Sequence, residues 1–244
     1  MILDALGRML ETLEQHGVKA ARQPRRARVG VSDYEAELRA IYAEWSDNLA
    51  AQLAHADADD RDRLTEAALA LLLVRLQRVG RRRLQVAVEE ALTETDADID
   101  LPDDLLMDAI ADNDQFLAAS LIPALRERVA NGLNDEDIVA ALAADEGEAA
   151  LGDLMDGAES RVALYAGAWW TLFHDAWGFV VGQRGSRVTA YLDPRAAHCN
   201  ECPLYQSVAG EVYESMADYL SQTGDRVPGE FECLGNCRCW LTEA

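Results

Sequence analysis

The chain has 244 residues, of which half are hydrophobic, so it can bury a substantial core. It carries 44 acidic and 22 basic residues, and the net charge of -22 argues against a protein whose main role is to coat nucleic acid. No stretch of about 18 uncharged apolar residues is present, and the N-terminus lacks the layout of a signal peptide. We therefore expect a soluble protein made in a cytoplasm, with no membrane partner.

The N-terminal region combines an amphipathic segment with a basic one. Residues 1–17 place apolar side chains at helical spacing and predict a helix. The stretch that follows contains Arg22, Arg25, Arg26 and Arg28 around a proline, and we interpret it as a linker or arm. These four arginines are candidates for contact with DNA or with an acidic partner, and a solvated loop is the alternative interpretation.

The central region predicts a succession of helices. Ser32 and Glu35 form a capping-box pattern that predicts a helix start, and a second helical run covers about residues 60–94. An acidic break with a proline follows at 96–104, where acids suit the N-terminus of the next helix. We expect shorter helices at 103–111, 113–130 and 134–144. From Glu94 to Glu159 the chain has 19 acids and two basic residues, which indicates a solvated face or a negative contact surface.

The most apolar segment, 160–182, predicts one long buried or interfacial helix that is rich in aromatic residues. After Gly185 the pattern changes, and residues 187–192 predict a strand. The sequence therefore predicts a helical body at 1–185 and a small domain at 186–244. The expected fold is mainly α, with an elongated helical body and a small C-terminal α+β domain stabilised by zinc.

All five cysteines lie in the predicted small domain, which is typical of a metal site in a cytosolic chain. A Cys-x-x-Cys pair lets two thiolates reach one tetrahedral zinc, and two of the three later cysteines can complete the site. A domain this small gains stability from such a metal. Disulfides and free thiols are the competing interpretations, and His198 is a possible alternative ligand. The candidate ligands are Cys199, Cys202, Cys233, Cys237 and Cys239.

The same segment resembles the C-terminal domain of phage head morphogenesis proteins, the minor head (minor capsid) proteins of Mu-like and related tailed phages. The resemblance covers about 55 residues and rests on Cys199-x-x-Cys202, Ala209-Gly210 and, most specifically, Asn236-Cys-Arg-Cys239. That family often has a histidine three positions before the first cysteine of the last motif. This chain has Cys233 four positions before Cys237 instead.

The resemblance implies a structural protein of the virion, assembled in the host cytoplasm, that associates with portal or inner capsid proteins and aids head assembly, DNA packaging or DNA delivery. On this reading Trp169, Trp170 and Trp177 are candidates for partner binding. No phosphate-binding loop, HExxH or G-x-S-x-G pattern is present, and a zinc saturated by thiolates has no open position, so we expect neither an enzyme nor a small-molecule substrate. The alternatives are a zinc-containing nucleic-acid-binding module and, third, a metal-dependent hydrolase.

Overall fold

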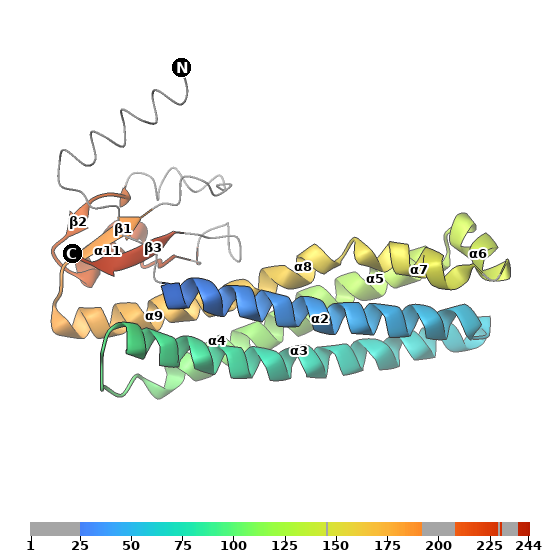
Figure 1. The fold of residues 1–244 in the computed structure, drawn as a ribbon, viewed down its shortest axis with the longest axis horizontal. Helices are drawn as coiled ribbons and strands as arrows, with labels where there is room; N and C mark the ends of the chain where they lie inside the picture. The colour runs from blue at the N-terminus through green and yellow to red at the C-terminus, as the bar shows by residue number, and fades with distance from the viewer. Residues whose placement is uncertain (1–24, 145, 192–207, 229, 231–238) are drawn as a thin grey trace, which may run out of the picture.

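The computed structural model describes residues 25–144, 146–191, 208–228, 230 and 239–244. This part of the chain is mainly helical, with an elongated bundle and a small three-stranded sheet that lies against one end of it (Figure 1). The expectation of a mainly α chain with a small C-terminal sheet is therefore confirmed.

The first two rods of the bundle are α2 (Arg25–His55) and α3 (Ala58–Glu94), which pack against each other in antiparallel directions (Figure 1). The expected helix at 60–94 is confirmed. The expected start at Ser32 is wrong, because α2 already begins at Arg25, so residues 25–28 are not a linker. The early turns pack against the core: Gly30 is buried directly against the indole of Trp169, where a Cβ would lie 2.1 Å from the ring.

The third rod is nearly continuous and consists of α4 (Asp103–Phe116), the π-helical turn η1 (Leu117–Leu121) and α5 (Ile122–Leu133). The expected interruption between 111 and 113 is wrong, because Asn113 is buried beside Gly80 of α3 and stays within the helix. The widened turn has a local cause. Pro123 has no N–H to donate and its ring crowds the preceding turn, so the Ile122 N–H bonds five residues back, to Leu117.

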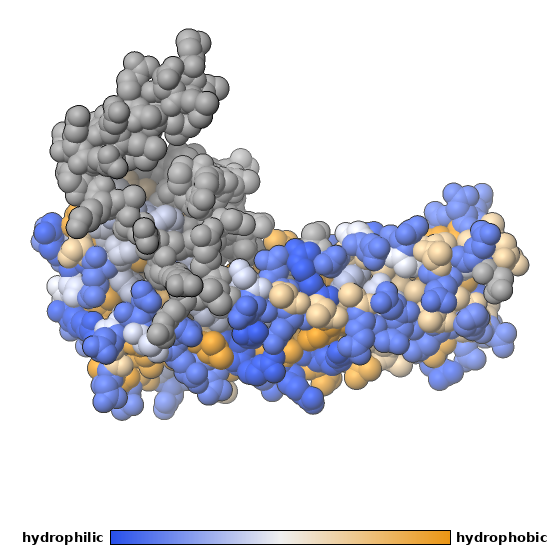
Figure 2. All heavy atoms as spheres, viewed as in Figure 1, coloured by the Kyte–Doolittle hydropathy of each residue, from blue (hydrophilic) through white to orange (hydrophobic). Residues whose placement is uncertain are grey.

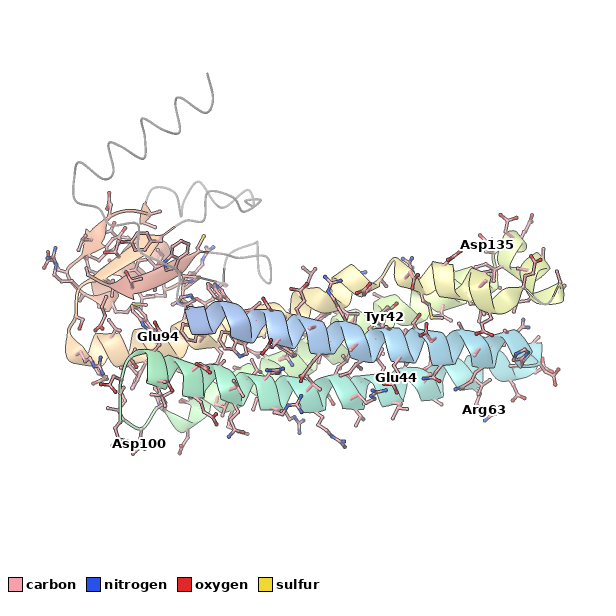
Figure 3. The ribbon with its side chains drawn as sticks, in the orientation of Figure 1. Tyr42, Glu44, Arg63, Glu94, Asp100 and Asp135 are labelled. Atoms are coloured by element: carbon pink, nitrogen blue, oxygen red, sulfur yellow. The ribbon has the colours of Figure 1, made fainter. Side chains whose placement is uncertain are left out.

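The chain turns back through α6 (Glu136–Ala143), which Asp135 caps by accepting a hydrogen bond from the Asp137 N–H at 3.0 Å. Asp135 lies at the tip of the bundle farthest from the sheet (Figure 3). The returning rod consists of α7 (Gly147–Asp156), α8 (Glu159–Ala163), the 3₁₀ turn η2 (Leu164–Ala166) and α9 (Gly167–Arg184). The expected single helix at 160–182 is wrong, because the tighter η2 turn separates α8 from α9. Val162, Ala166 and Trp169 are buried on both sides of that turn.

Antiparallel packing of these rods buries one apolar stripe from each. Two aromatic side chains of α2 also form hydrogen bonds with neighbouring helices. The Tyr42 hydroxyl donates to the Met155 carbonyl at 2.7 Å, and the Trp45 indole donates to the Ala68 carbonyl at 3.0 Å. The visible face of the bundle is mostly hydrophilic, with hydrophobic patches between the charged side chains (Figure 2). Within the described ranges, no helix is both long and apolar enough to cross a bilayer.

The C-terminal sheet has the order β2-β1-β3, with both neighbours antiparallel to the central strand. Its strands are β1 (Val188–Tyr191), β2 (Val212–Tyr213) and β3 (Trp240–Glu243), and α11 (Met216–Thr223) follows β2. The expected strand at 187–192 is confirmed. Gly185 ends α9 in the left-handed conformation (φ 64°), which is why the chain can turn sharply there into β1.

Candidate functional site

Cys239 is the one candidate zinc ligand that falls within the described residues. It lies immediately before β3, its side chain is buried, and its carbonyl accepts a hydrogen bond from the Trp170 indole of α9 at 3.1 Å. The next residue, Trp240, stacks on Tyr191 of β1 with 5.4 Å between ring centroids. The end of the cysteine-rich segment is therefore fixed both to the sheet and to the bundle.

The other candidate ligands, namely Cys199, Cys202, Cys233, Cys237 and His198, lie outside the described residues, as does Arg22. Among the residues that are described, no three His, Cys, Asp or Glu side chains gather in a way that could hold a metal. A zinc site in this chain would therefore have to draw its other ligands from the four other cysteines or from His198. The chemistry of the cysteines suits it, because thiolates are preferred zinc ligands, and Cys239 could supply one of them.

The three tryptophans expected to bind a partner lie in the core. The exposed fractions are 0% for Trp169, 3% for Trp170 and 4% for Trp177. Trp169 stacks on Phe173 at 5.4 Å, and Trp170 joins α9 to β3. Their predicted contact with a partner is therefore corrected to a role in packing, because α9 is covered by α2 and α3 on one side and by the sheet on another.

The arginines of the bundle that could attract nucleic acid are largely engaged with acids of neighbouring helices. Arg82 and Arg83 donate to Glu37 of α2 at 2.7 and 2.9 Å, and Arg81 pairs with Asp114 of α4. Burial alone would raise the pKa of Glu37, but the hydrogen bonds from the two arginines outweigh it and lower that pKa. Of the basic arm, Arg25, Arg26 and Arg28 belong to the first turns of α2.

His174 is completely buried on α9 between aromatic rings. Its ring lies edge-on to Trp170 at 4.7 Å and to Phe173 at 5.3 Å. Neither ring nitrogen has a hydrogen-bond partner among the described residues. Burial lowers the pKa of His174 to about 3, so the imidazole is neutral at physiological pH. A neutral, enclosed imidazole of this kind belongs to the core.

A groove of about 1000 Å³ lies between α4, α9 and α11, which gather at the sheet end of the bundle (Figure 1). Asp175 projects from α9 into it and is half-buried there. Burial, together with repulsion from Glu230, raises the pKa of Asp175 to about 7. The sequence did not predict this groove. One signal was available, since Asp175 is the single Asp, Glu, Lys or Arg between Arg161 and Arg184.

Comparisons with family models, curated proteins and solved structures find no match to this chain.

Proposed function

We propose that this chain is a structural minor head protein of a tailed phage, which associates with portal or inner capsid proteins through its elongated helical body. The proposal starts from the resemblance of the cysteine-rich segment, with Asn236-Cys-Arg-Cys239 as its most specific part. A long helical bundle suits a protein that acts by contact. The acids of the 94–159 region lie along it from Glu94 and Asp100 at the sheet end to Asp135 at the tip (Figure 3).

The hydrogen bond from Trp170 to the Cys239 carbonyl is the observation that carries this proposal. It attaches the last residue of the resembling motif to the most buried helix of the bundle. A hydrogen bond that a buried indole donates to a backbone carbonyl fixes that backbone and serves structure rather than turnover. We therefore assign the motif to holding the C-terminal segment in place, with zinc as its second anchor.

The first experiment concerns the metal. We expect native mass spectrometry of the reduced full-length chain to find one zinc, and thiol counting on that form to find one reactive cysteine, because a tetrahedral site takes four of the five thiolates. Single Cys→Ser variants at the five positions should identify the spare one, since that variant alone keeps its zinc. A chain without zinc whose five thiols all react, or whose cysteines pair as disulfides, would exclude the metal.

The second experiment concerns the place of action. We expect affinity-tagged full-length chain, produced in host cells in which the phage assembles, to sediment with heads and to cross-link to portal protein. A Cys237→Ser variant should be incorporated less, whereas Ser221→Ala, an exposed hydroxyl on α11, should behave as the wild type. Chain that stays free in the host cytoplasm contradicts the proposal. Recovery with DNA that is lost steeply as salt rises would favour the nucleic-acid-binding alternative instead.

A further inference from the structure

The groove between α4, α9 and α11 is built from three segments that are far apart in the chain. Along α9 it extends from Ala168 to Gln183, which at about 1.5 Å per residue corresponds to roughly 22 Å. That length is enough for about four turns of another helix. Its size and shape are therefore those of a seat for a helix rather than for a compact small molecule.

The lining of the groove is apolar along its centre. α9 contributes Leu172 and Phe179, α11 contributes Leu220, and α4 contributes Phe116, whose side chain is 57% exposed. Gly182 of α9 also lines the groove, and a Cβ there would meet only the Met216 side chain, at 3.7 Å. The backbone of a bound helix can therefore approach α9 closely at Gly182. An exposed phenylalanine beside a groove of this kind is typical of a surface that a partner covers.

Acidic residues outnumber basic ones around the groove. Asp108 and Asp112 stand on α4, Asp175 on α9, and Asp225 and Glu230 follow α11, against a single base, Arg161. None of these five acids forms an ion pair with another described residue. By contrast, acids elsewhere on the bundle, such as Glu37, Glu44 and Glu66, pair with arginines. The carboxylates of the groove are therefore available to basic groups of another molecule, because no described basic residue pairs with them.

We propose that this groove binds an amphipathic helix of a partner protein, with its apolar face on Leu172, Phe179 and Phe116 and with lysines or arginines beside that face. Apolar contact supplies the affinity, and the carboxylates select a basic partner and set its orientation. An anionic lipid surface is disfavoured, because the same carboxylates would repel it. The inference does not depend on the proposed function, since it concerns the chemistry of the partner and not its origin.

The test uses two fluorescent 18-residue peptides with the same leucine face, one with lysines on its polar face and one with glutamates. Fluorescence anisotropy with the full-length chain should show binding of the lysine peptide and no binding of the glutamate peptide. Phe116→Ser removes an apolar contact and Asp112→Lys reverses a charge that attracts the basic peptide, so each should weaken binding by about tenfold or more. Circular dichroism should show that both variants keep the wild-type helix content.

Matched controls separate the groove from the overall negative charge. Leu71→Ser removes a side chain that is 61% exposed on α3, and Asp47→Lys reverses an exposed charge on α2; neither should change the affinity by more than about twofold. Equal weakening by groove and control variants would overturn the proposal, because the peptide would then follow net charge alone. A dimer in sedimentation experiments that Phe116→Ser converts to a monomer would also overturn it, since the occupant would be a second copy.

Discussion

Replacing Trp169 with alanine is expected to lower the free energy of unfolding by about 3–5 kcal/mol, the usual range for removing a fully buried large aromatic side chain. The indole has no exposed surface, stacks on Phe173 and lies directly against Gly30 of α2. Its removal would leave a cavity where α2 and α9 meet. Guanidinium unfolding followed by far-ultraviolet circular dichroism measures the loss.

Two further variants sharpen this prediction. Trp169→Phe should cost less than about 2 kcal/mol, because it keeps one ring and removes an indole N–H that has no hydrogen-bond partner among the described residues. Leu71→Ala, on the exposed face of α3, should change stability by no more than about 0.5 kcal/mol. A Trp169→Ala variant as stable as Leu71→Ala would mean that Trp169 is not in the core.

The contrast between α3 and α9 explains how far the sequence could predict this fold. In α3 the buried positions recur every three or four residues, so its ends could be predicted to within two residues. α9 is apolar on nearly all sides because α2, α3, α4 and the sheet surround it. Without a polar face, periodicity could neither locate its start nor distinguish core tryptophans from interface tryptophans.

The two candidate sites also differ in how far the sequence could predict them. Cysteine spacing is local, so a metal site could be proposed from the sequence, and Cys239 does lie at a fixed, buried position. The residues of the groove are distant in sequence. Phe116, Phe179 and Leu220 come together only because α4 and α9 run side by side and α11 packs against α9. Each is an ordinary helix residue on its own, and no spacing rule connects them.

The pH dependence of stability is expected to conceal two opposite contributions from adjacent residues of α9. Burial lowers the pKa of His174 from 6.5 to about 3, and burial with repulsion from Glu230 raises the pKa of Asp175 from 3.8 to about 7. Between about pH 4 and 6.5, the unfolded state protonates the histidine but not the aspartate, and the folded state does the reverse. Each state then holds one of these two protons, so together the pair contributes almost no slope.

Replacing either residue should reveal the pH dependence that the other residue contributes to stability. With Asp175→Asn, the histidine contribution remains alone. Stability relative to the wild type should then fall by up to about 1.4 kcal/mol for each unit that the pH drops from 6.5 to 4.5, because only the unfolded state takes up the proton. With His174→Leu, the aspartate contribution remains, and stability relative to the wild type should rise over the same interval.

The measurement is a series of guanidinium unfolding curves from pH 4.5 to 7.5 for the wild type, both single variants and the double variant. The difference in the free energy of unfolding between each variant and the wild type isolates the two residues. Paired acids such as Glu44 and Glu66, and any thiolate–zinc site, contribute alike in all four proteins. The double variant should differ from the wild type by a constant offset. If both single variants instead run parallel to the wild type, neither group changes its proton affinity on folding. The burial of His174 and the placement of Asp175 in the groove would then both be contradicted, because burial must disfavour the charged form of each group.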